Sequence, residues 1–115
     1  MKCSAIVHQS LYDHNDKKYI RLLLPYSCAE YVAATHASKS HLLMHMNVVN
    51  PLEGLILTVK VPYRYRRVMC TVIGKPIQAL VKGDVLEIDV DFKGVWNVGE
   101  YSGYSWLLKK SMYID

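Results

Sequence analysis

The 115-residue sequence predicts one mainly β domain, a small antiparallel barrel with one main α-helix in its N-terminal half. Three observations predict this fold class. Residues 86–92 alternate apolar and charged side chains, the pattern of a strand with one solvated face. Short apolar segments rich in β-branched residues recur along the chain, separated by turns that contain glycine or asparagine. Only the segment after Pro25 has a helical composition, and a small curved barrel is the economical fold for such a chain.

The chain begins with a predicted hairpin. Residues 3–12 have strand character, and residues 13–16 (Asp-His-Asn-Asp) form a strong turn signal. Residues 18–24 continue as a second apolar strand, which Pro25 ends.

A helix is predicted from about residue 28 to about residue 38. Ser27 and Glu30 have the spacing of a capping box, in which each side chain satisfies a free amide of the first turn. The alanine-rich segment that follows has good helix propensity. Whether the helix continues to Asn47 stays open, because residues 38–40 (Ser-Lys-Ser) can interrupt it.

Residues 55–76 predict a long bent hairpin. Two β-branched runs, residues 55–61 and 68–73, flank Pro62 and a tip with the sequence Tyr-Arg-Tyr-Arg-Arg. From Lys60 to Lys75 there are five basic residues and no acidic one.

The C-terminal part predicts two further strands. Turns are expected at residues 74–76 and 82–84, followed by a strand with one apolar and one charged face. The apolar face consists of Leu86, Ile88, Val90 and Phe92. Further turns are expected at residues 93–94 and 97–99, and the last strand at about 104–114.

Composition narrows the class of protein. The longest apolar runs are too short to span a bilayer, and no signal peptide is recognisable at the start. The three cysteines are scattered without a CxxC pair, which indicates reduced thiols and a cytoplasmic location (the host cytoplasm if the protein is viral). No membrane partner is therefore expected.

The charge distribution points to a polyanionic partner. The net charge is +4, and nine tyrosines stand against one phenylalanine. Arginine interleaved with tyrosine suits a single-stranded nucleic acid, because guanidinium groups grip phosphates while phenol rings stack on exposed bases. A solvated hairpin tip, whose arginines only keep the sheet edge soluble, is the simpler alternative.

A resemblance points the same way. Residues 68–114, with the segments VIGKP, VKGDVLEIDVDFKG and YSGYSWLLKKSMYI, resemble the C-terminal half of small OB-fold single-stranded DNA-binding proteins of the filamentous-phage type. In that family a basic, tyrosine-bearing hairpin grips the strand, which residues 63–67 match. A Lys-Gly-Asp-type turn leads into an alternating strand, which Lys82, Gly83 and Asp84 match. The helix-bearing N-terminal half departs from the family pattern.

Other kinds of site have less support. Glu87, Asp89 and Asp91 form a row of carboxylates, and Asp91-Phe92-Lys93 has the form of a nuclease element that would place metal-bound water near phosphate. The alternative is a solvated face whose acids pair with basic residues of a neighbouring strand. His36, His41 and His45 lie within ten residues, and His41 and His45 have the i, i+4 spacing that can set two imidazoles on one helix face for zinc. No glutamate lies between them as in HExxH and no third ligand is obvious, so partly exposed structural histidines are expected. Cys70 is expected to be a small buried apolar residue.

The sequence therefore predicts a single-stranded DNA-binding protein with little sequence specificity, of phage- or plasmid-type replication or recombination, with RNA left open as a ligand. A small protein-binding inhibitor or adaptor with a basic docking hairpin is the first alternative, and a metal-dependent nuclease the second. A homodimer is expected, because a small barrel with open edges gains footprint by pairing. No catalytic residue, metal or cofactor is expected. The predicted nucleic-acid-binding residues are Lys60, Tyr63, Arg64, Tyr65, Arg66, Arg67, Lys75, Tyr101 and Tyr104. Trp106 is expected in the core, whereas Tyr101 and Tyr104 fit either the core or the surface.

Overall fold

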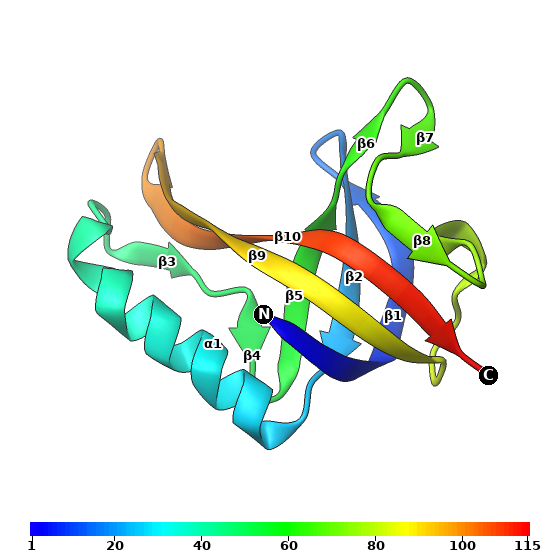
Figure 1. Cartoon of the computed structure of the whole chain (residues 1–115). Helices are drawn as coiled ribbons and strands as arrows, with labels where there is room; N and C mark the ends of the chain where they lie inside the picture. The colour runs from blue at the N-terminus through cyan, green and yellow to red at the C-terminus, as the bar shows by residue number, and fades with distance from the viewer.

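Five strands close into a barrel in the computed structural model, which describes residues 1–115 (Figure 1). These strands are β1 (Lys2–His14), β2 (Lys17–Leu23), β5 (Ile56–Val61), β9 (Val85–Val98) and β10 (Tyr101–Ile114). Around the barrel the order is β1-β2-β5-β10-β9, and β9 pairs with β1 to close it. All neighbours are antiparallel except β5 and β10. The mainly β, OB-like barrel with one main helix is confirmed.

Shorter elements extend this barrel. The strands β3 (Asn47–Val49) and β8 (Thr71–Ile73) both pair in parallel with β10, and β4 (Leu52–Glu53) pairs with β5. A separate hairpin consists of β6 (Tyr63–Arg64) and β7 (Arg67–Val68) and projects from the barrel (Figure 1). Two 3-10 turns, η1 (Ser40–Leu42) and η2 (Ile77–Ala79), complete the fold.

The helix α1 spans Tyr26–Lys39, two residues earlier than predicted at its start. The capping box is wrong: Pro25 precedes the helix, no side chain caps it, and Ser27 already lies inside the first turn. Proline is tolerated at this N-cap position because an amide there would have no partner within the helix. The helix ends before Asn47, which settles the open question. No helix is both long and apolar enough to cross a membrane.

The long hairpin predicted for residues 55–76 is also wrong. Its first arm, β5, pairs with β2 and β4, whereas its second arm, β8, pairs with β10. Only the tip between Pro62 and Met69 folds back on itself, with the Met69 amide donating to the Pro62 carbonyl at 2.8 Å. The arms separate because both edges of β5 are already paired, one with β2 and the other with β4 and β10.

The turn predicted at residues 93–94 is instead a bulge within β9. Phe92 pairs with Trp106 and Gly94 with Ser105, so Lys93 is the extra residue, and Gly94 has a φ of 114°. A bulge of this kind bends the strand without ending it. The β9–β10 turn lies at residues 99–100, so the last strand begins earlier than predicted. The turn at residues 82–84 is confirmed just before β9.

The core fills the barrel interior and the side covered by α1. Leu86, Ile88 and Val90 point inward and Trp106 is buried, all as predicted, while Phe92 packs against this core. On α1 the buried residues are Ala29, Val32 and His36, which lie on one face of the helix. The three cysteines are free thiols, as expected, and Cys70 is half-buried rather than fully buried.

Candidate nucleic-acid interface

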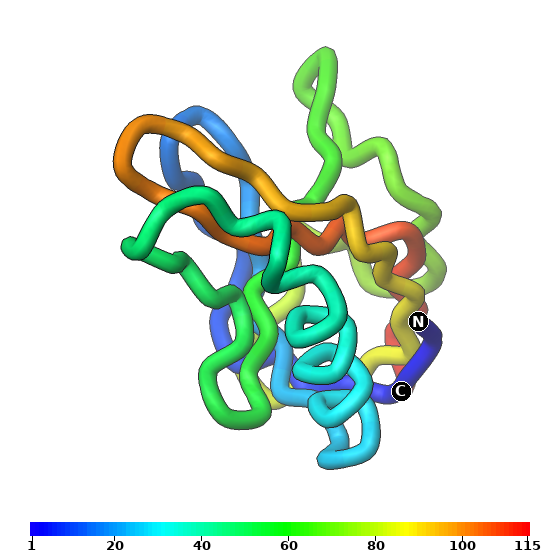
Figure 2. Tube along the Cα trace, turned by 90° about the vertical axis from the view of Figure 1, so that its left-hand side faces the viewer, coloured from blue at the N-terminus to red at the C-terminus, as the bar shows by residue number.

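The β1–β2 turn and the β9–β10 turn lie at the same end of the molecule in both ribbon views (Figures 1 and 2). Between the two hairpins is a hollow of about 600 Å³, which we call the aromatic groove. Its aromatic lining consists of Tyr12, Tyr19, Trp96, Tyr101, Tyr104 and Trp106. Residues 49–51, Glu53, Thr58 and Lys60 complete most of the remaining wall. The groove is thus assembled from both turns and from the outer face of β5.

A second hollow of about 590 Å³ adjoins the first, and we call it the lysine pocket. It is lined by residues 13–18, Lys60, Val61 and Tyr63, and it shares His14, Asn15 and Lys60 with the aromatic groove. The two hollows therefore form one continuous surface with Lys60 at the junction.

Two of the lysines in this pocket have no acidic partner. Lys18 forms an ion pair with Asp13 at 2.6 Å, but neither Lys17 nor Lys60 forms a salt bridge. Burial lowers the pKa of Lys60, and the nearby charge of Lys17 lowers it further. Asp13 and Asp16 also line the pocket, but neither lies within salt-bridge distance of Lys17 or Lys60, and a bound anion would relieve the repulsion between these two ammonium groups.

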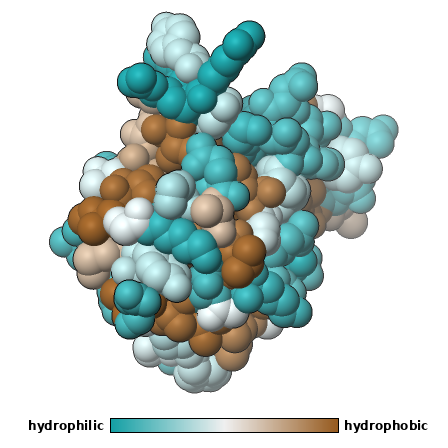
Figure 3. Space-filling view, turned by 90° about the vertical axis from the view of Figure 1, so that its right-hand side faces the viewer, coloured by the Kyte–Doolittle hydropathy of each residue, from teal (hydrophilic) through white to brown (hydrophobic).

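The β6–β7 tip continues this surface towards solvent. Its residues are Tyr63, Arg64, Tyr65, Arg66 and Arg67, and none of the arginines forms a salt bridge. The Lys18 ammonium lies 4.6 Å from the centre of the Tyr63 ring, which joins the tip to the lysine pocket. Figure 3 shows the tip as a hydrophilic projection at the top of the molecule.

The turn at the tip has an unusual backbone for its residues. Tyr65 and Arg66 have φ values of 54° and 61°, a region that glycine and asparagine enter far more readily than tyrosine or arginine. The β1–β2 turn has the same conformation, but there Asn15 and Asp16 occupy the two positions. The tip therefore stores strain of the kind often found at functional sites, and it leaves the Tyr65 side chain 84% exposed.

By sequence, Tyr101 and Tyr104 fit the core and the surface equally. In the structure, one is exposed and the other is buried. Tyr101 is 54% exposed and lines the groove. Tyr104 is 8% exposed, and its ring stacks on His36 with centres 4.0 Å apart. One face of the Tyr104 ring is therefore already covered, so we assign it to the groove wall rather than to base stacking.

His36 is a core residue, not the partly exposed histidine that the sequence predicts. Its side chain lies among Phe92, Tyr104 and Trp106, and its Nε2 accepts a hydrogen bond from the Trp106 indole at 2.9 Å. Burial lowers the pKa of His36.

Lys75 is separated from the other predicted binding residues. Its ammonium donates to Asp84 at 2.7 Å and lies 5.3 Å from the centre of the Tyr113 ring. This pairing raises the pKa of Lys75 and lowers that of Asp84. Lys75 lines neither hollow, so it belongs to the structural turn before β9.

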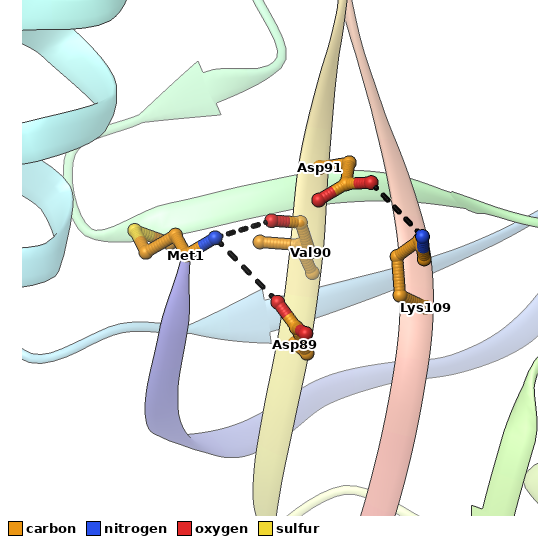
Figure 4. Close-up of polar contacts among 5 residues, drawn as sticks. All are labelled: Met1, Asp89, Val90, Asp91 and Lys109. Carbon is orange, nitrogen blue, oxygen red and sulfur yellow. Dashed lines mark hydrogen bonds and ion pairs between the residues drawn. The ribbon is translucent and has the colours of Figure 1, made fainter.

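The row of carboxylates on β9 is occupied by local contacts (Figure 4). The Asp89 carboxylate lies 3.5 Å from the Met1 nitrogen, and Asp91 pairs with Lys109 on the neighbouring strand at 3.3 Å. Glu87 accepts a hydrogen bond from Ser4 at 2.8 Å. The predicted pairing with a basic residue of the next strand is thus confirmed for Asp91. No group of three or more histidine, cysteine or acidic side chains is arranged to hold a metal ion.

Three aromatic groove residues were missed by the sequence analysis. Tyr12 and Tyr19 face each other across the first hairpin, with ring centres 5.9 Å apart. They are equidistant from the Asn15-Asp16 turn, so the hairpin register could have revealed this pair. Trp96 lies flat over Gly103, where an added Cβ would come within 2.5 Å of its ring. Only the cross-strand pairing of these two residues reveals that contact.

Comparisons with known proteins find no matching family model, no similar curated protein and no matching solved structure.

Proposed function

We propose that the protein binds single-stranded DNA, with little sequence preference, along the aromatic groove, the lysine pocket and the β6–β7 tip. The observation that carries this proposal is the junction at Lys60, where a hollow lined by tyrosine and tryptophan meets one that contains the unpaired Lys17 and Lys60. A single strand can use both features, because every nucleotide carries a phosphate and an unpaired base.

The chemistry of each part supports the proposal. Tyr101, Trp96 and the Tyr12–Tyr19 pair offer ring faces and edges to unpaired bases, and stacking accepts every base. Lys17, Lys60 and the three tip arginines offer positive charge that no protein carboxylate neutralises. In OB-type barrels the face between the first and last hairpin turns is the one that carries oligonucleotides. A phage- or plasmid-type replication or recombination setting remains part of the proposal and rests on the resemblance of residues 68–114.

Trp96 lines the groove, so its fluorescence can report binding there. We expect a fluorescent oligothymidylate to bind in anisotropy titrations, more weakly at high salt, with quenching of tryptophan emission. Trp96→Phe should remove most of the quenching, because the other tryptophan, Trp106, is buried. Duplex DNA and single-stranded RNA of matched length complete the panel and decide between the nucleic acids.

Two results would contradict the proposal. Equal affinity for duplex and single-stranded DNA would show binding by charge alone, without the groove. If the protein binds no nucleic acid at low salt, the alternative is favoured in which the unpaired arginines of the tip bind an acidic protein.

A further inference from the structure

The strand β8 has an unpaired edge. β8 pairs with β10 on one side and has no strand on the other. No hydrogen bond outside the regular elements involves residues 70–73. The surrounding segment, residues 68–73 (Val-Met-Cys-Thr-Val-Ile), contains no charge, proline or glycine. Such an edge lacks the charged or proline residues by which soluble proteins usually prevent pairing.

An apolar stripe continues from this edge across the outer face of the barrel. The register places Ile73 beside Met112, and Ile114 beside Val85. Val85 in turn pairs with Ile6 on β1. Directly paired residues share a face of the sheet, and Met112 and Ile114 lie two residues apart on the same face of β10. These side chains therefore form one stripe over β8, β10, β9 and β1, which Glu87, the β9 partner of Met112, borders. Four of them remain 39–44% exposed: Ile6, Ile73, Val85 and Ile114.

This stripe lies away from the aromatic groove. It crosses the beginning of β9 and the end of β10, whereas the aromatic groove lies at the opposite end of the same hairpin (Figure 1). Figure 3 faces the side that carries β8 and shows hydrophobic patches below the hydrophilic tip. Contiguous exposed apolar surface of this kind typically marks an interaction site.

We propose that the β8 edge and the apolar stripe, hereafter the β8 surface, bind a second copy of this chain. An antiparallel pairing of β8 with itself is two-fold symmetric, so the free edge is complementary to its own copy. Two charged residues flank the stripe on the same face, Glu87 beside Met112 and Lys110 beside Thr71. Because they have opposite signs, two copies of net charge +4 need not face like charges there.

Sedimentation velocity of the protein without DNA, across a dilution series, tests the proposal. We expect a reversible dimer in the wild type. Ile73→Lys should weaken the dimer at least about 100-fold, because each copy then buries an unpaired lysine in an apolar interface. Leu42→Lys is the matched control, since Leu42 is 47% exposed and Ile73 is 44% exposed, but Leu42 lies outside the β8 surface. This control should dimerise like the wild type.

A second variant guards against a folding defect in Ile73→Lys. Thr71 is exposed on the same edge, so Thr71→Lys should give a monomer with an unchanged circular dichroism spectrum and unfolding midpoint. Amide hydrogen exchange at residues 71–73 should be slower in concentrated than in dilute wild-type protein. A wild type that is monomeric throughout, or a dimer that survives both lysine variants, overturns the proposal. Because no DNA is present, neither outcome depends on the proposed function.

Discussion

Arg66 is a fully solvated cation at the tip, with no carboxylate within salt-bridge distance. If it neutralises a phosphate, Arg66→Ala should weaken binding of single-stranded DNA and flatten its dependence on salt. Each phosphate contact on a single strand contributes about 0.7 to the log–log salt slope. Titrations at several salt concentrations measure this slope. Lys39→Ala removes the same charge at the end of α1, far from the interface, and should leave the slope unchanged.

Tyr65 tests stacking instead of charge. Its ring is 84% exposed, and the Arg64 guanidinium lies 5.7 Å from the ring centre. Tyr65→Ala should weaken binding by roughly 1–3 kcal/mol with little change in the salt slope, because stacking releases no counterions. Tyr65→Phe should retain most of the affinity, since it keeps the aromatic face. Tyr31→Ala, on the exposed face of α1, is the control. If Tyr65→Ala binds like the wild type, the tip is only a solvated edge.

His36 should make the stability of the fold depend on pH. Its folded-state pKa is lowered by burial from an ordinary value of 6.5, so the folded protein holds this imidazole neutral while the unfolded chain protonates it. The folded protein is therefore fully stable above the pKa that His36 has in the unfolded chain. It loses stability as the pH falls through the lower pKa that His36 has in the folded protein. Urea unfolding on both sides of pH 6.5 measures the effect.

Two variants isolate the histidine responsible. His36→Gln can still accept the Trp106 hydrogen bond but does not titrate, so its loss of stability on acidification should be smaller than that of the wild type. His41→Gln replaces an exposed histidine and should leave the wild-type pH dependence intact. Equal pH profiles for all three proteins would contradict a titrating role for His36.

At the scale of elements, the sequence predicts what depends on local pattern and misses what depends on pairing. The first hairpin and the alternating face of β9 were predicted, because turn residues and two-residue periodicity are local signals. The hairpin at residues 55–76 failed because β5 and β8 each pair with a distant strand instead of with each other. The capping-box prediction failed because the helix begins directly after Pro25. The spacing of Ser27 and Glu30 alone does not show which of the two possible starting points the helix uses.

The two positive-φ turns give a prediction about the β6–β7 element. Exchanging the tip residues for those that this backbone favours, Tyr65→Asn with Arg66→Gly, should relieve strain of about 1 kcal/mol while weakening DNA binding. Urea unfolding and amide exchange of the tip hairpin measure the first effect, and anisotropy titration the second. The reverse exchange in the other turn, Asn15→Tyr with Asp16→Arg, should destabilise the protein. A tip exchange that leaves DNA affinity unchanged would argue against a binding role for this turn.

At the scale of the whole molecule, the barrel decides which residues meet. The predicted residues Lys60, Tyr63 and Tyr101 do lie on the continuous surface, but Lys17 joins them only because the first hairpin folds beside the end of β5. No spacing along the sequence links residue 17 to residue 60. Lys75 was wrongly predicted to lie on this surface for the same reason. It is close to the tip in sequence, but in the structure its side chain turns away from the tip and pairs with Asp84.

This arrangement predicts that the two ends of the surface depend differently on the length of the bound strand. Tyr101 lies in the groove and Arg66 at the tip, with the lysine pocket between them. An oligonucleotide of about 4 residues can occupy the groove alone, whereas one of about 16 can also reach the tip. Tyr101→Ala should therefore weaken both, and Arg66→Ala should weaken the longer one much more. Titration of both lengths against both variants and the Lys39→Ala control measures this difference. Equal losses at both lengths for Arg66→Ala would mean that the strand does not run from the groove to the tip.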